Sequence, residues 1–156
     1  MLIISHRGNI DGPSVNDENR PDYIDHALEK NFEVEIDIWL MNNEIYLGHD
    51  EPLYKINKNW LFERRQKTWI HCKNFDSLSY LSASEESKYL NFFFHQKDQY
   101  TLTSKNYIWV YPSQPYDMNS VIVSRFSKEF KNYIKDRPYG VCTDFPNELN
   151  LIINNK

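Results

Sequence analysis

Residues 34–38 read Val34-Glu35-Ile36-Asp37-Ile38, a strict alternation of apolar and acidic side chains. This period of two predicts a β-strand from Phe32 to Leu40 with both acids on one face. Two neighbouring carboxylates in an apolar strand repel each other and lose hydration, and a divalent cation relieves both costs. We therefore interpret Glu35 and Asp37 as candidate metal ligands, the alternative being a solvent-facing strand edge.

Other short apolar stretches lie on both sides of this strand and alternate with helical patterns. A strand at residues 2–5 precedes the polar loop Asn9–Asn19 and a helix from Pro21 to Lys30. Asn42-Asn43 then turns the chain into a strand at Glu44–Leu47. The remaining predicted strands are Thr68–Cys72, Asn91–His95, Tyr107–Tyr111, Ser120–Val123 and Tyr139–Thr143, and the remaining helices are Phe75–Ser84, Ser127–Lys135 and Glu148–Asn154. This alternation favours an α/β fold with about seven parallel strands.

Length and composition indicate a soluble globular protein. The 156 residues suit a single domain spanning residues 1–156, and no apolar run reaches the roughly 18 residues of a membrane span. The formal net charge of -4 argues against a nucleic-acid partner, which usually requires a basic face. Cys72 and Cys142 lie in predicted strands without a CxxC pair, so we expect buried, reduced thiols. No signal-peptide pattern is visible at the N-terminus, so we expect a cytoplasmic location.

Residues suited to an anionic substrate follow several of the predicted strands. His6-Arg7-Gly8 ends the first strand, where imidazole can move a proton and guanidinium can bind two phosphate oxygens. His49-Asp50 follows the hairpin, where the carboxylate can orient the imidazole. His71 and Lys73 share a strand face with Trp69, and the alternative there is a solvated strand end. The carboxyl ends of parallel strands are where α/β barrels place their active sites, so we expect these groups to meet.

The order and spacing of these motifs resemble the glycerophosphodiester phosphodiesterase family. The strongest part of the resemblance spans residues 3–50, through His6-Arg7-Gly8, Glu18-Asn19, Glu35-Ile36-Asp37 and Gly48-His49-Asp50. The ending Gly140-Val141-Cys142-Thr143-Asp144-Phe145-Pro146 resembles the family's last barrel strand with its Thr-Asp-x-Pro sequence.

The resemblance implies a TIM barrel related to the phosphatidylinositol phospholipases C and the sphingomyelinases D. Because such a barrel typically takes about 250 residues, we expect a reduced TIM-like (β/α) barrel. This barrel would have seven to eight mostly parallel strands, with some of its outer helices missing.

The resemblance also implies roles for individual residues. These are an acid/base pair, His6 and His49; two metal ligands, Glu35 and Asp37; and the substrate contacts Arg7, Lys73 and Glu18. In the family's Glu-Asn-Thr motif the threonine is replaced here by Arg20. His95 and Trp109 lie on two further predicted strands, and we expect both to border the same mouth and contact substrate. The alternatives are a structural, hydrogen-bonded role for His95 and a core position for Trp109.

The main departure from the family pattern is at position 71. The family usually has Glu-x-Lys here, with the glutamate as third metal ligand, whereas this chain has His71-Cys72-Lys73. The resemblance implies Mg²⁺ or Ca²⁺, which prefer oxygen ligands, but a ligating His71 would favour Mn²⁺ or Zn²⁺. Alternatively, His71 contacts the phosphate, or the site holds no metal.

Taken with the resemblance, these residues predict a metal-dependent phosphodiesterase. Its partner would be a glycerophosphodiester-like small molecule, hydrolysed to a phosphomonoester and an alcohol by His/His acid-base catalysis. We expect neither nucleic-acid binding nor stable membrane insertion. Two alternatives remain: a lyase that releases a cyclic phosphate, and a non-catalytic barrel that binds a phosphorylated ligand.

Overall fold

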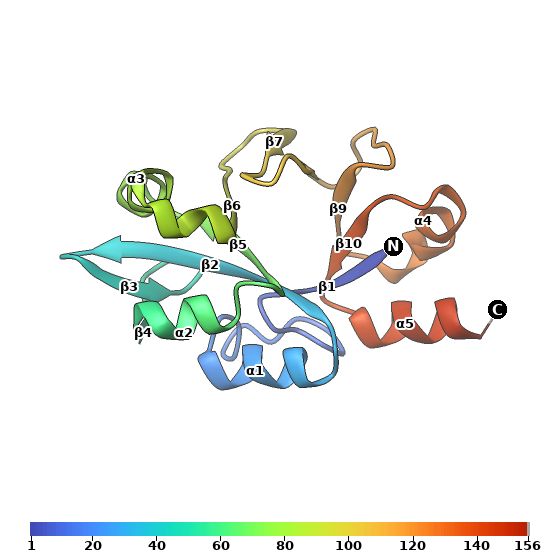
Figure 1. The fold of residues 1–156 in the computed structure, drawn as a ribbon. Coiled ribbons are helices and arrows are strands. Elements are labelled where there is room, and N and C mark those ends of the chain that lie inside the picture. The colour runs from blue at the N-terminus through green and yellow to red at the C-terminus, as the bar shows by residue number, and fades with distance from the viewer. Residues whose placement is uncertain (156) are drawn as a thin grey trace.

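Parallel strands form the centre of the molecule, of which the computed structural model describes residues 1–155. Among those residues the strands with parallel pairing are β1 (Leu2–His6), β2 (Glu33–Met41), β5 (Thr68–Cys72), β6 (Asn91–Phe94), β8 (Ile108–Val110), β9 (Ser120–Ser124) and β10 (Gly140–Thr143). Their spatial order is β6-β5-β2-β1-β10-β9-β8, and the sheet curls into a ring-like wall (Figure 1). Each of these strands was predicted from the sequence to within a few residues.

Within residues 1–155, three antiparallel strands complete the sheet: β3 (Glu44–Leu47), β4 (Tyr54–Ile56) and β7 (Tyr100–Leu102). The predicted strand β3 is confirmed and pairs with the outer half of β2, whereas β4 and β7 were not predicted. β7 pairs with β8 and lies beside β6. There the amide of Ser104 donates to the Phe92 carbonyl at 2.8 Å, and the hydroxyl of Thr101 donates to the Phe94 carbonyl at 2.9 Å. β7 therefore joins the two ends of the row of parallel strands.

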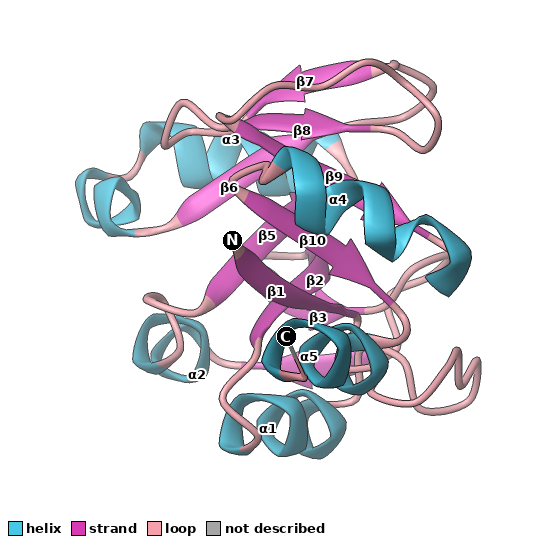
Figure 2. Ribbon diagram, turned by 90° about the vertical axis from the view of Figure 1, so that its right-hand side faces the viewer, coloured by secondary structure: helices cyan, strands magenta, loops and turns pink. Residues whose placement is uncertain are grey.

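The helices lie outside the curved sheet (Figures 1 and 2). They are α1 (Pro21–Glu29), α2 (Lys58–Glu63), α3 (Phe75–Ala83), α4 (Phe130–Asp136) and α5 (Pro146–Asn154), with 3-10 turns η1 (Glu85–Tyr89) and η2 (Ser127–Glu129). Helix α2 was not predicted. The connections 95–107 and 111–119 contain no helix, so the expected loss of outer helices and the reduced TIM-like barrel are both confirmed. None of the described helices combines the length and the apolar character needed to cross a membrane.

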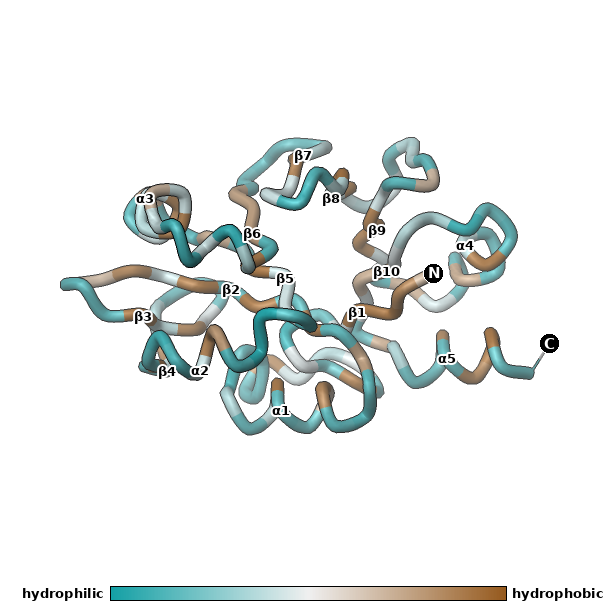
Figure 3. Tube along the Cα trace, viewed as in Figure 1, coloured by the Kyte–Doolittle hydropathy of each residue, from teal (hydrophilic) through white to brown (hydrophobic). Residues whose placement is uncertain are grey.

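Two apolar layers pack against the opposite faces of the sheet. Val34, Ile36 and Ile38 of β2 pack with residues of α1 and α3 on the outside, as the alternation predicts. Inside the ring, Phe93 stacks on Trp109 with ring centroids 4.5 Å apart, and Trp69 lies 5.9 Å from Trp109. Hydrophobic residues accordingly follow the strands in Figure 3, while most loops are hydrophilic. This filled interior leaves the polar ends of the strands as the floor and walls of an open mouth.

Candidate active site at the barrel mouth

The inward-facing side of each strand becomes polar at its carboxyl end. Strand pairing aligns His6 of β1 with Glu35 of β2, and Asp37 of β2 with His71 of β5. The side chains meet in a cavity of about 370 Å³, called here the inner chamber, which eight of the ten predicted site residues line. Of the other two, Asp37 is fully buried and Glu18 lines an adjoining cavity of about 580 Å³, the outer chamber.

Glu35, Asp37 and His71 form a compact cluster within the mouth. Their potential ligand atoms all lie within 4.8 Å of one another, and the two acids are 2% and 0% exposed. Oε2 of Glu35 is buried and accepts no hydrogen bond from residues 1–155. A buried carboxylate oxygen without a partner is costly, and a cation at this position would remove the cost. The cluster therefore has the residue types, spacing and unmet charge of a metal site.

Four side chains from other segments surround Asp37. Asn19 donates a hydrogen bond to Oδ2 at 2.9 Å, and Arg7 Nε lies 2.9 Å from the same oxygen. On Oδ1, His71 Nδ1 lies at 2.8 Å and Lys73 Nζ at 3.4 Å. Burial raises the pKa of Asp37, but the contact with His71 and the charge of Arg7 outweigh it and hold the pKa well below the usual range. Asp37 is therefore a permanent anion.

Glu35 is affected in the opposite direction. Burial and the neighbouring charge of Asp37 raise the pKa of Glu35 above its ordinary value. The two acids differ because the closest basic side chains lie 2.8–2.9 Å from Asp37, whereas those nearest to Glu35 lie at 3.8–3.9 Å.

A backbone acceptor fixes the orientation of the His71 ring. Nε2 of His71 lies 2.9 Å from the carbonyl oxygen of His95, and because a carbonyl can only accept, Nε2 carries the hydrogen. Nδ1 is then directed at Glu35 and Asp37, at 3.8 Å and 2.8 Å. A backbone carbonyl that accepts from the distal nitrogen is one of the common ways in which proteins orient a metal-binding histidine.

His6 is held by an acid to which the sequence assigned no role. Nδ1 of His6 donates to Oδ1 of Asp144 at 2.8 Å, and Asn9 donates to the same oxygen at 2.8 Å. Burial lowers the pKa of His6, but the bond to Asp144 and the charge of Glu35 outweigh it, and the pKa is raised. Burial raises the pKa of Asp144, yet the bond from His6 lowers it overall. Cys142 of β10 faces the interior, and side chains two residues apart on a strand share a face. This spacing is the signal in the sequence that would have placed Asp144 at the mouth.

A tight turn positions His49 at the rim. Gly48 has φ of +148°, and a Cβ there would lie 2.0 Å from the Glu51 carbonyl oxygen, so a side chain cannot be accommodated without movement. Trp39 Nε1 donates to the Gly48 carbonyl at 2.7 Å. His49 Nδ1 donates to Asp50 at 2.7 Å, and burial lowers the pKa of His49 below its ordinary value.

The two remaining predicted contacts also line the inner chamber: His95 directly follows β6, and Trp109 lies on β8. Trp109 is 4% exposed and stacks within the interior, so most of its ring belongs to the core. Burial and the charge of His71 lower the pKa of His95. Tyr111 and Arg125 also line the chamber and were not predicted, although Arg125 continues the inward alternation of Val121 and Val123.

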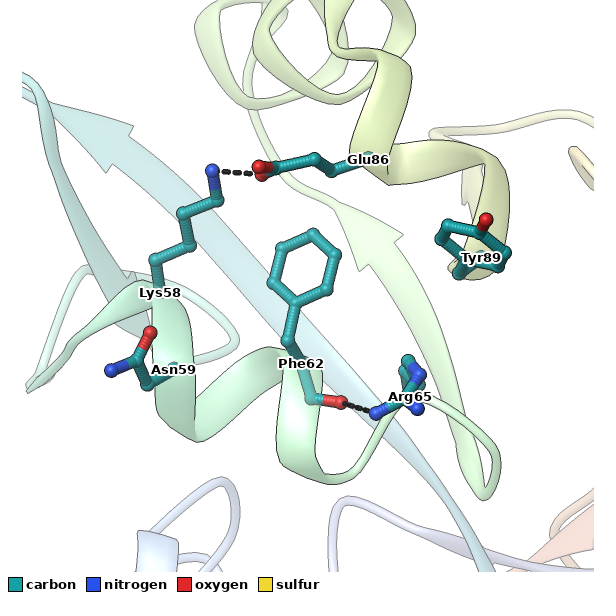
Figure 4. Close-up of a pocket in the computed structure, with 6 residues that line it drawn as sticks. All are labelled: Lys58, Asn59, Phe62, Arg65, Glu86 and Tyr89. Carbon is teal, nitrogen blue, oxygen red and sulfur yellow. Dashed lines mark hydrogen bonds and ion pairs between the residues drawn. The ribbon is translucent and has the colours of Figure 1, made fainter.

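A separate cavity of about 460 Å³ lies between α2 and η1 (Figure 4). An ion pair between Lys58 and Glu86 crosses it, and Phe62 lies between these elements. None of the residues that line this cavity belongs to the candidate site.

Comparisons with known proteins find similarity in structure. No family model matches the sequence, and no curated protein matches it significantly. A crystal structure of a glycerophosphodiester phosphodiesterase from Parabacteroides distasonis matches 99% of this chain and 97% of its own, with a TM-score of 0.65 and 13% identity. A glycerophosphoryl diester phosphodiesterase from the same organism matches 99% of this chain and 86% of its own, with a TM-score of 0.62 and 15% identity. At these identities the similarity shows a common fold.

Proposed function

We propose that this chain is a metal-dependent phosphodiesterase of the glycerophosphodiester phosphodiesterase family. Its reaction hydrolyses a glycerophosphodiester-like small molecule to a phosphomonoester and an alcohol. The fold shared with two solved phosphodiesterases supports the class of reaction. The observation that carries the proposal is the inner chamber, in which two histidines with oppositely shifted pKa values face the Glu35/Asp37/His71 cluster.

The opposite shifts assign separate roles to the two histidines. Near neutral pH the lowered pKa of His49 leaves its imidazole neutral, so it takes the proton from the attacking hydroxyl as general base. The raised pKa of His6 favours its protonated form, so in the proposed reaction it donates its Nε2 proton to the oxygen of the departing alcohol. The glycerol 2-hydroxyl oxygen forms a bond to phosphorus while the bond to the leaving oxygen breaks, which releases the alcohol and leaves a cyclic phosphate. Water then attacks the phosphorus of the cyclic phosphate, and the bond to the 2-oxygen breaks as that oxygen takes up a proton, which gives the phosphomonoester.

Cationic side chains balance the charge that accumulates on the phosphate. Arg7 and Lys73 both reach the inner chamber from positions fixed by Asp37. The transition state carries more negative charge on the phosphate oxygens than the substrate does, so each cation stabilises the transition state more than the substrate. Glu18 binds Arg7 at 3.0 Å and so restrains the guanidinium.

The cluster Glu35, Asp37 and His71 is the proposed metal site. When bound, a divalent ion would neutralise phosphate charge and lower the pKa of the attacking hydroxyl. His71 contributes a nitrogen ligand, which favours Mn²⁺ or Zn²⁺ over Mg²⁺ or Ca²⁺.

The proposal is tested by direct turnover. Purified protein is incubated with glycerophosphodiesters and Mg²⁺, Ca²⁺, Mn²⁺ or Zn²⁺, and the release of glycerol 3-phosphate is measured. His6→Ala and His49→Ala should each lower kcat by about 10²- to 10⁴-fold, the usual loss for a general acid or base. His26→Ala, an exposed histidine on α1, is the matched control and should leave kcat unchanged. Unaltered activity in either site variant would refute the assignment, and phosphorus NMR would detect a cyclic product if water does not complete the reaction.

A further inference from the structure

Arg125 is a cation at the mouth that the proposed reaction does not use. It follows β9 on the face that carries Val121 and Val123 into the interior, and it lines both the inner and the outer chamber. Its guanidinium carbon lies 5.9 Å from the centroid of the Tyr111 ring, an arrangement that holds the side chain over the chamber.

Arg125 differs from the other two permanent cations of the inner chamber in its charge balance. Arg7 contacts Asp37 and Glu18, and Lys73 lies 3.4 Å from Asp37. Among residues 1–155 no carboxylate forms an ion pair with Arg125. An exposed guanidinium that faces a cavity and forms no ion pair with a carboxylate of residues 1–155 is available to bind an anion from a ligand.

Strand order places Arg125 opposite the proposed metal cluster. His71 lies on β5 and Lys73 directly follows it. In one direction around the ring, the path from β5 to β9 passes β2, β1 and β10, and in the other direction it passes β6, β7 and β8. Three strands therefore separate β5 from β9 on either side. A phosphate held beside His71 and Lys73 therefore leaves Arg125 facing the part of the substrate that lies away from the reacting phosphorus. The chamber volume of about 370 Å³ is suited to such a small organic ligand.

We propose that Arg125 binds a second anionic group, a carboxylate or a phosphate monoester, on the far part of the phosphodiester. This inference rests on the function proposed above and specifies its substrate class. The guanidinium presents two parallel N–H donors that match such a group, and its positive charge repels a cationic headgroup such as choline.

Binding to the metal-free protein tests the anion site without turnover. Glycerophosphoinositol and glycerophosphoinositol 4-phosphate, a pair that differs by one phosphate, are titrated by calorimetry in the presence of a chelator. The phosphorylated probe should bind about tenfold more tightly, as expected for one charge-assisted contact. Arg125→Gln should abolish this preference and Arg125→Lys should keep part of it. Lys128→Gln removes a positive charge three residues further along the chain that lines neither chamber, and it should keep all of the preference.

Two results would overturn the inference. One is an absence of preference in the wild-type protein, and the other is an equal loss of affinity for both probes in Arg125→Gln, which would place Arg125 on the reacting phosphate. Turnover is measured separately with the metal-loaded protein. A failure to cleave either probe would reject the proposed phosphodiesterase activity even where the binding preference is present, whereas cleavage without a preference would reject the anion site alone.

Discussion

Replacing Asp144 with asparagine isolates the contribution of one carboxylate to the proposed general acid. The variant keeps the size of the side chain and an oxygen that accepts from His6 Nδ1, but it removes the negative charge 2.8 Å from the ring. Both side chains are largely shielded from water, at 17% and 13% exposed, so solvent screens the lost interaction little. A hydrogen bond to a charged group contributes about 1.5–3 kcal/mol, which corresponds to roughly a tenfold to hundredfold change in equilibrium.

The expected result is a change in the pH profile. His6 acts in its protonated form, so the activity falls as pH rises through its pKa, and the raised pKa places this basic limb above the ordinary histidine value. Asp144→Asn lowers that pKa and moves the basic limb to lower pH. At pH 8 we expect kcat/KM to fall by about tenfold to a hundredfold, with a smaller loss at pH 6.

The assay combines kcat/KM between pH 5 and pH 9 with an NMR titration of His6 in the metal-free protein. Asp50→Asn is the matched control, because it removes the carboxylate bonded to the other histidine at a position where that carboxylate is 92% exposed. Water screens such a contact, so its effect should be small. The reasoning is refuted if the two variants shift their histidines equally, or if the His6 titration in Asp144→Asn is the same as in the wild type.

The remaining predictions concern the metal cluster and the rim. Because burial raises the pKa of Glu35, its charged form destabilises the fold as pH rises above the ordinary pKa of a carboxylate. Glu35→Gln should therefore raise the Tm of the metal-free protein at pH 8 and abolish the Tm increase that added Mn²⁺ produces. An undiminished increase would contradict the role of Glu35 as a ligand. His71→Glu should shift the affinity ratio measured by calorimetry from Mn²⁺ toward Mg²⁺, whereas an unchanged ratio would exclude position 71 from the metal site. Gly48→Ala should lower kcat at least about tenfold while unfolding stays cooperative, because the added Cβ forces the turn at Glu51 to move and displaces His49. Full activity would show that this turn does not position the histidine.

The sequence predicts the long, regularly patterned elements and misses the short ones. The strand β2 is recognisable because its inward and outward faces differ sharply in chemistry. By contrast, β4 and β7 are three residues each, too short for an alternation to emerge. Helix α2 has six residues and one buried apolar side chain, Leu61, so its helical period is equally weak.

The candidate site shows the same dependence on pattern. Residues in recognisable motifs, such as His6 and Glu35, could be identified along the chain. Asp144 and Arg125 lie directly beyond the last inward-facing apolar residue of their strands, so continuing the alternation would have found both. The low pKa of Asp37 depends on His71 and Arg7, which belong to other segments of the chain, and no local pattern contains that information.

The contact between β7 and β6, which closes the ring of strands, has a mechanical consequence for the mouth. Continuous ladders of backbone hydrogen bonds join the parallel neighbours, whereas β6 and β7 meet through one backbone bond at Ser104 and side-chain hydroxyls. Local opening of a protein starts where such restraints are fewest, so amide hydrogen exchange should be fastest along this seam of the wall. His95 follows β6 and Tyr111 follows β8, which places the seam between two residues that line the inner chamber. We therefore expect the wall of the chamber to yield first on this side, which lies away from β2 and its two acids.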